Sequence, residues 1–250
     1  MSQPYDVIRC PACNESVLVE TNHLRCVGCA RRLPIHTPPI DFLDDAHTSG
    51  FFDRLAPIYE TPLWFGMLYR LLVGPGGPPD DRTWFQQAVG PDAEAVLDVG
   101  CGTGRLLRYV AADMQFGWGI DLSAGMLRRA AARTSEPHVH YARMQAEGLY
   151  FADASFDAVI CAWAIHLFAD PAAALSEMRR VLHSDGRVAG STLTPGGVLR
   201  VRPIRSVLGR TLDTSTFGEH TLTGMLVEAG FAPPHLERYG AGLFFIADTG

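Results

Sequence analysis

The pattern of apolar and polar positions is most regular in the last part of the chain. From about residue 93, short apolar runs alternate with stretches whose apolar residues recur at helical spacing. Strands are expected at 95–99, 116–121, 138–142, 158–162, 187–191, 236–239 and 242–247, and helices at 105–112, 126–133, 171–182 and 222–229. Strands that alternate with helices predict a parallel sheet with right-handed crossovers. The last two strands, separated by a short glycine-containing turn, predict an antiparallel hairpin at its end. The expected fold class is therefore α/β, with a seven-stranded, mostly parallel sheet.

Two less regular zones precede this core. Up to about residue 39 the chain is rich in cysteine, with short alternating runs such as 16–20, and it is too small to build a core of its own. Between about 40 and 90 apolar residues recur at helical spacing, and a Gly- and Pro-rich run at 74–79 interrupts them. The helical positions are Phe51, Leu55, Ile58 and Tyr59, then Trp64, Leu68, Leu71 and Leu72. We expect an N-terminal module (1–40), a helical lid or linker (41–90) and an α/β core (91–250).

Composition and charge narrow the classes of protein. With 47% hydrophobic and 19% charged residues, the chain is expected to be globular rather than disordered. A net charge of −6 offers no general attraction for a phosphate polymer, so nucleic acid is disfavoured as a partner, although a local basic patch stays open. No apolar run reaches the roughly 18 residues of a membrane span, and the N-terminus lacks the features of a signal peptide. These features predict a cytoplasmic protein.

A glycine loop follows the strand at 95–99. Gly100, Gly102 and Gly104 lie between this strand and the next helix, where glycine lets backbone amides approach a ligand closely. Asp121 ends the following strand, and its carboxylate can accept the hydroxyl hydrogens of a ribose. The alternative, an ordinary tight turn and a helix-capping Asp121, explains each feature singly but not their agreement in one βαβ unit. The loop therefore predicts a nucleoside ligand.

The sequence of the same loop disfavours two other classes of nucleotide-binding protein, the P-loop proteins and the dinucleotide-binding proteins. It has no Gly-Lys-Ser/Thr continuation, so it lacks the lysine that a phosphate-binding P-loop needs. A dinucleotide-binding loop normally reads G-x-G-x-x-G, whereas Gly104 arrives one residue early.

Residues 96–104, Val-Leu-Asp-Val-Gly-Cys-Gly-Thr-Gly, resemble motif I of the class I S-adenosylmethionine-dependent methyltransferases. Residues 119–127 resemble the ribose-binding segment of that family, and 154–159 resemble the strand that opens toward the reaction centre. Residues 180–187 resemble the R-V-L-x-P-G-G turn, with the Pro and one Gly altered. The resemblance extends from about Phe51 to the C-terminus. It implies a Rossmann-like fold and methyl transfer from S-adenosylmethionine.

The resemblance also implies contacts with the cofactor. The implied residues are Gly100, Gly102 and Gly104 at the methionine moiety with Asp98 supporting the loop, Asp121 at the ribose, Leu122, Gln145 and Ala146 at the adenine, and Cys161 on a neighbouring strand. Family members commonly place Asp before Ala at the adenine amino group, and the Gln145 carbonyl can accept the same hydrogen bond without a charge. For Cys161, burial as a small apolar side chain is the alternative.

Four of the six cysteines form two C-x-x-C knuckles, Cys10 with Cys13 and Cys26 with Cys29. Each knuckle can direct two thiolates at one ion, which gives the tetrahedral sulfur site that zinc prefers. Disulfides fit poorly with a cytoplasmic chain, and an accidental thiol cluster is the other alternative. Because four protein ligands leave no open position, the expected zinc is structural.

The segment after the second knuckle resembles the zinc segment that precedes some ribosomal RNA guanine methyltransferases, and also that of plastid and bacterial methyltransferases of unassigned substrate. The second group fits better, because its pattern includes a helix with Phe52, Asp53, Ala56 and Tyr59. Such a helix covers the cofactor in many small-molecule methyltransferases. Tyr59 is therefore a candidate to hold or deprotonate the acceptor, with a helix cap at Asp53 and a core aromatic at Tyr59 as the alternative.

Methyl transfer depends mainly on alignment, and it needs a base only when the nucleophile carries a proton. His166 lies a few residues beyond the strand at 158–162, at the sheet edge where open α/β sheets bind ligands, and is a candidate base. A hydrogen-bonded loop histidine is the alternative. A group of arginines could hold an anionic substrate or RNA, or form a solvated helix face; they are Arg200, Arg202, Arg205 and Arg210.

Together these features predict an S-adenosylmethionine-dependent methyltransferase that acts on a small-molecule acceptor, such as a secondary metabolite. One alternative is a ribosomal RNA methyltransferase that uses the zinc module for docking. Another is a scaffold that binds the cofactor without transferring a methyl group.

Overall fold

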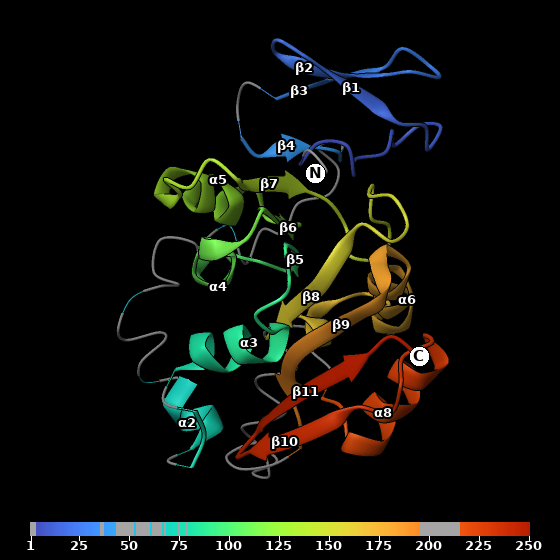
Figure 1. The fold of residues 1–250 in the computed structure, drawn as a ribbon. Coiled ribbons are helices and arrows are strands. Elements are labelled where there is room, and N and C mark those ends of the chain that lie inside the picture. Colours follow the sequence, from blue (N-terminus) through green and yellow to red (C-terminus); the bar gives the residue numbers. More distant parts are fainter. Residues whose placement is uncertain are drawn as a thin grey trace.

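The computed structural model describes residues 4–35, 38–43, 53, 61, 67, 69–74, 76–78, 80–195 and 216–250. A large mixed sheet forms the centre of this part, and a small antiparallel sheet lies at its N-terminal end (Figure 1). The large sheet has the order β10-β11-β9-β8-β5-β6-β7-β4. Its strands are β4 (Ile40–Asp41), β5 (Ala95–Val99), β6 (Phe116–Asp121), β7 (Val139–Arg143), β8 (Phe156–Ala162), β9 (Leu182–Leu193), β10 (His235–Tyr239) and β11 (Gly242–Asp248).

The strand directions confirm the expected α/β fold. The strands from β4 to β9 pair in parallel, and β11 pairs antiparallel with both β9 and β10. The described part of the sheet has eight strands where seven were expected, because β4 adds to the edge at β7. Its two residues are too few for a periodic pattern, and Asp41 lies 102 positions before its partner Arg143. The local sequence therefore does not reveal this strand.

Helices cover both faces of the large sheet. One face carries α3 (Asp81–Val89), α4 (Arg105–Val110) and α5 (Ala124–Arg133), and the other carries α6 (Pro171–Val181) and α8 (Glu219–Glu228) (Figure 1). Two 3-10 turns, η2 (Ala111–Asp113) and η3 (Ile165–Leu167), and a short helix, α2 (Tyr69–Val73), are also described. Because the central strands are buried on both sides, neighbouring residues of one strand enter different cores. On β5, Leu97 packs in the α6–α8 layer and Val96 in the α3–α5 layer.

The start of β9 and the hairpin of β10 and β11 determine the strand order at one end of the large sheet. β9 begins at Leu182, five residues before the expected strand, because Leu182 pairs with Phe156 across a register shift in β8. β10 and β11 form the expected hairpin, in which Gly240 has a φ of 59° and Tyr239 pairs with Gly242. The strand that comes last along the chain, β11, therefore lies inside the sheet between β9 and β10.

The N-terminal module contains β1 (Val17–Glu20), β2 (His23–Cys26) and β3 (Arg32–Pro34), and it packs on the end of the large sheet that carries β7 (Figure 1). Its buried side chains Ile8 and Leu24 belong to the same apolar cluster as Trp118 of β6. The Trp118 indole N–H donates to the Pro4 carbonyl at 2.8 Å. The module and the large domain thus share one core.

Part of the expected helical zone lies outside the described residues. This holds for Tyr59 and its helix apart from Asp53, for Trp64 and Leu68, and for the arginines between 200 and 210. Leu71 and Leu72 lie in α2, and Gly74, Gly76, Gly77 and Pro78 are not helical. Within the described ranges, no helix is both long and apolar enough to cross a bilayer.

Candidate functional site

A cavity of about 270 Å³ opens at the carboxyl ends of the central parallel strands, where open α/β sheets bind ligands. Residues that follow β5, β6, β7 and β8 line it, so it gathers segments far apart in the sequence. Among the residues that the sequence singled out, those brought together here are Gly100, Gly102, Asp121, Leu122, Gln145 and Ala146. The glycine loop, the candidate ribose carboxylate and the candidate adenine segment therefore share one space.

The glycine loop needs its glycines for two physical reasons. Gly100 has a φ of 78°, and a Cβ there would lie 2.4 Å from the Cβ of Ala164. Gly104 has a φ of 68°, and a Cβ there would lie 2.3 Å from the Tyr141 hydroxyl oxygen. Side chains are strained at positive φ and have no room at these positions. Gly104 does not line the cavity and instead turns the chain into α4.

Asp121 ends β6 and forms one side of the cavity. One carboxylate oxygen accepts the Gly102 N–H at 2.9 Å and the other accepts the Ser123 N–H at 2.8 Å. These bonds fix the carboxylate against the glycine loop and leave it further lone pairs, because an ionised carboxylate has about four acceptor sites. Burial raises the Asp121 pKa above its usual value, and the two backbone N–H groups oppose that rise.

Asp98 lies on β5, just before the glycine loop, and does not line the cavity. Its side chain is buried, and neither carboxyl oxygen has a hydrogen-bond partner. Burial raises the pKa of Asp98 to about 8, the charge of Asp121 adds to the rise, and the charge of Arg105 opposes it. A buried acid without a partner beside a ligand cavity fits a cationic ligand group.

The wall segment, residues 144–147, forms the side of the cavity that follows β7. Glu147 accepts the Ala169 N–H at 3.0 Å and the Asp170 N–H at 3.2 Å, and so joins the wall segment to the loop before α6. The sequence analysis did not single out Glu147 or Phe168, which also line the cavity. Their signal is position alone, since each follows the end of β7 or β8 by a few residues.

The structure does not bring Cys161 into the cavity. Cys161 is fully buried, because side chains on β8 alternate and the next residue, Ala162, takes the cavity-lining position. Burial raises its thiol pKa well above the usual value.

His166 is also absent from the lining of the cavity. It lies on η3 with only 5% of its surface exposed, and its Nδ1 is 3.2 Å from the Thr192 hydroxyl oxygen. Burial lowers the His166 pKa to about 4, so the imidazole is neutral at pH 7. The turn at η3 directs this side chain into the core, and the candidate base lies beside the cavity rather than in it.

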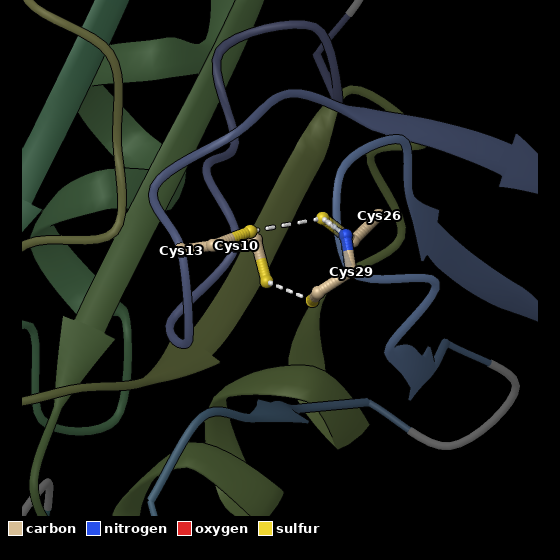
Figure 2. A group of neighbouring side chains, drawn as sticks. All are labelled: Cys10, Cys13, Cys26 and Cys29. Carbon is tan, nitrogen blue, oxygen red and sulfur yellow. Dashed lines mark hydrogen bonds between the residues drawn. The ribbon is translucent and has the colours of Figure 1, made fainter.

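The four cysteines of the N-terminal module converge on one point (Figure 2). Their sulfur atoms lie within 4.8 Å of one another, with 3.6 Å between Cys10 and Cys29 and 3.4 Å between Cys13 and Cys26. Tetrahedral zinc with bonds of about 2.3 Å places its sulfur ligands roughly 3.8 Å apart. The backbone N–H groups of Gly28 and Cys29 donate to the Cys26 sulfur, and such donation favours the thiolate that binds metal. The residues therefore fit a zinc ion.

Comparisons with known proteins agree with this geometry. Residues 97–190 match the family model described as "Methyltransferase domain". The chain is 30% identical over 152 residues to a 2-phytyl-1,4-naphtoquinone methyltransferase of Trichormus variabilis, covering 56% of this chain and 62% of that protein. It is 36% identical over 126 residues to a malonyl-[acyl-carrier protein] O-methyltransferase of Erwinia pyrifoliae, covering 50% and 47%. The chain thus spans about half to three fifths of these curated relatives.

Solved structures show the same fold. A Thermotoga maritima protein described as a SAM-dependent methyltransferase, possible histamine N-methyltransferase, is similar with a TM-score of 0.62 and 21% identity, covering 80% of this chain and 99% of that one. The match confirms the Rossmann-like architecture, and the family model, whose range of 97–190 includes the glycine loop, confirms the family resemblance of that loop. By sequence, residues 97–190 therefore form a methyltransferase domain similar to those of S-adenosylmethionine-dependent enzymes, and the Rossmann-like fold of the described residues agrees with this.

Proposed function

We propose that this protein transfers the methyl group of S-adenosylmethionine to a small-molecule acceptor. The observation that carries the proposal is the single cavity in which the Gly102 backbone, the Asp121 carboxylate and the Gln145–Ala146 pair meet. These groups suit the amino acid, ribose and adenine parts of one nucleoside ligand. When bound, the cofactor supplies an electrophilic methyl group on a sulfonium.

The residues of the chain would bind and orient this cofactor. Asp121, held by two backbone N–H groups, keeps lone pairs for the ribose hydroxyls. Gln145 offers an amide carbonyl to the adenine amino group, and the apolar side chains of Leu122 and Met126 line the same space. Asp98, buried and unpaired, would favour the positive charge of the ligand through the intervening loop.

We propose that the four thiolates of the N-terminal module hold a structural zinc. The sulfur distances support this, and four protein ligands leave no position at which a substrate could bind. Zinc binding would then contribute to the folding free energy of the module, because a segment of this size has little core of its own. We also keep the division into module (1–40), lid or linker (41–90) and core (91–250) as a proposal.

A small-molecule acceptor is supported by the names of the two sequence relatives, which refer to a naphthoquinone and to a malonyl group on an acyl-carrier protein. The chain also has a net charge of −6, which disfavours binding to RNA. The role of His166 as a base stays a prediction: with a pKa of about 4 the imidazole can accept a proton only weakly. The role of Tyr59 at the acceptor likewise stays a prediction.

The test uses purified protein with methyl-labelled S-adenosylmethionine and an RNA-containing cell extract, followed by separation of the small molecules from the RNA. Label in the small-molecule fraction is the expected result. Label in the RNA fraction would replace the proposal by the RNA methyltransferase alternative. Calorimetric binding of S-adenosylhomocysteine without transfer to any fraction would favour the scaffold alternative.

A further inference from the structure

The wall segment (144–147) is held at both of its ends by the N-terminal module together with the two residues that follow it, Asp41 and Phe42. Before it, β4 pairs with β7, and the Phe42 N–H donates to the Arg143 carbonyl at 3.1 Å. After it, residues 150–152 pair with the chain just before Cys10. There the Arg9 N–H donates to the Tyr150 carbonyl at 2.8 Å, and the Ala152 N–H donates to the Val7 carbonyl at 2.7 Å. The four residues that line the adenine side of the cavity therefore lie between two contacts with one module.

Side chains reinforce both contacts. The Phe42 and Tyr150 rings stack with 5.4 Å between their centroids and 18° between their planes, and so link the residue that follows β4 to the chain after the wall segment. Ile8 forms a β-bridge with Phe151. Both Ile8 and Phe151 are fully buried, so this contact belongs to the shared core rather than to a mobile surface.

A third connection runs from the module to the cavity through Arg143. The guanidinium is buried, donates from Nη1 to the Asp41 carboxylate at 3.0 Å, and donates from Nε to the Leu122 carbonyl at 3.1 Å. Leu122 lines the cavity and directly follows Asp121. A buried guanidinium needs counter-charge, and Asp41, the last residue of β4, supplies one and helps to fix the position of Arg143.

The metal site and these contacts belong to one unit. Cys10 directly follows the residues that pair with 150–152. Cys10 and Cys26 are also buried in the same apolar cluster as Ile8 and Ile40. A zinc ion bound by the two knuckles would hold the chain around Cys10 and the chain around Cys26 against each other. Without it, a segment with little core of its own loses much of its order.

We propose that the N-terminal module is a built-in support for the adenosine-binding wall, so that zinc at the four cysteines and cofactor in the cavity strengthen each other's binding through Asp41 and Arg143. Asp41 and Arg143 are positioning residues, because they act through the wall segment and the Leu122 carbonyl. The inference rests on the proposed function for its ligand. Its physical content is a coupling free energy, which must act equally in both directions.

The first experiment measures the affinity for S-adenosylhomocysteine by calorimetry, using the full chain at a temperature at which circular dichroism shows every variant folded. Asp41→Asn keeps an oxygen for the Leu43 N–H, which Asp41 now accepts at 3.0 Å, and removes both the charge opposite Arg143 and the oxygen that accepts from its Nη1. We expect it to weaken binding about fivefold to tenfold, within the usual range of coupling between sites. Asp41→Glu should restore part of the affinity, and Asp185→Asn, at an exposed carboxyl of β9, should leave it unchanged.

The second experiment follows hydrogen exchange of the amides at 144–149 in the zinc-loaded and the chelated full chain. Faster exchange in this segment, with β8 still protected, is expected on removal of zinc, and this readout needs no cofactor. The reciprocal readout is the resistance of zinc to a competing chelator, which should rise when S-adenosylhomocysteine is added.

The outcomes separate the two proposals. The support role is wrong if the zinc-loaded wild type and Asp41→Asn bind S-adenosylhomocysteine equally well and if removal of zinc leaves the exchange at 144–149 unchanged. In that case the proposed function stands. If the wild type binds no S-adenosylhomocysteine, the proposed function falls, and the coupling with it.

Discussion

Replacing Asp98 by asparagine removes a buried charge without changing the shape of the side chain. Asp98 has 1% of its surface exposed, and neither carboxyl oxygen has a partner. Its carboxylate is therefore costly whenever the cavity holds no cation. The variant replaces it by a neutral amide, so the comparison of wild type with Asp98→Asn isolates the cost of this charge.

The pKa gives the size and sign of the effect. A rise from 3.8 to about 8 corresponds to about 6 kcal/mol, at about 1.4 kcal/mol for each tenfold change in proton affinity. Because the folded chain binds this proton more tightly than the unfolded chain, folding stability is highest below the usual Asp pKa and falls as the pH rises toward 8. Asp98→Asn should lack this loss and be the more stable protein at pH 8 to 9. The figure of about 6 kcal/mol is an upper limit, since the amide also lacks partners.

The assay is urea unfolding of ligand-free protein between pH 5 and 9, with Asp185→Asn as the exposed control. Wild type and control should lose stability with rising pH, and Asp98→Asn should lose clearly less. Equal pH slopes for all three proteins would refute the argument. A second readout is proton release on binding S-adenosylmethionine at pH 7, measured by calorimetry in two buffers; the cationic ligand should expel the Asp98 proton, and the variant should release none.

Four further changes test other parts of the site. In Asp121→Asn, one of the two backbone N–H groups that now bond the carboxylate would face the amide N–H of the new side chain. The affinity for S-adenosylhomocysteine, measured by calorimetry, should therefore fall roughly tenfold to a hundredfold, and an unchanged affinity would remove Asp121 from the site. Cys13→Ser should lower the zinc content below one ion per chain and the melting temperature of the protein, because the module shares its core with the large domain; a purified wild-type protein that contains no zinc would contradict the metal assignment. Gly104→Ala should destabilise the protein by about 1–3 kcal/mol in urea unfolding, since φ is 68° and the Cβ meets Tyr141; equal stability would mean that the loop adjusts freely. His166→Ala should lower turnover and leave cofactor affinity nearly unchanged, and normal turnover would leave His166 no catalytic role. Because the pKa of His166 in the wild type is about 4, the wild-type pH–rate profile should show no step near 6.5.

The parts of the fold predicted from the sequence are those specified by local pattern. β5 and β6 have the predicted bounds, because each is a short apolar run closed by a polar or glycine signal. The early start of β9 and the whole of β4 depend on partners far along the chain, at Phe156 and Arg143, which no local pattern identifies. Periodicity reports which face of an element is buried, not which strand lies beside it.

The same division holds for the candidate site. Backbone-determined groups such as the Gly102 loop and Asp121 reach the cavity as the spacing suggested, because strand ends fix where they lie. Cys161 and His166 come from the same sheet edge, yet alternation on β8 and the turn at η3 direct both side chains into the core. Side-chain direction within one or two residues of a strand end is set by packing, which the sequence alone does not show.

The place of β11 inside the sheet has a consequence for how the chain is made. During synthesis from the N-terminus, β9 and β10 leave the ribosome before their common neighbour exists, so each presents an unpaired edge until Gly242–Asp248 is available. The domain therefore cannot complete its sheet strand by strand during synthesis, because the last step of sheet formation needs residues 242–248. A nascent chain stalled before residue 242 is expected to be a substrate for chaperones or for aggregation, even though its glycine loop and the residues that line the cavity are already complete.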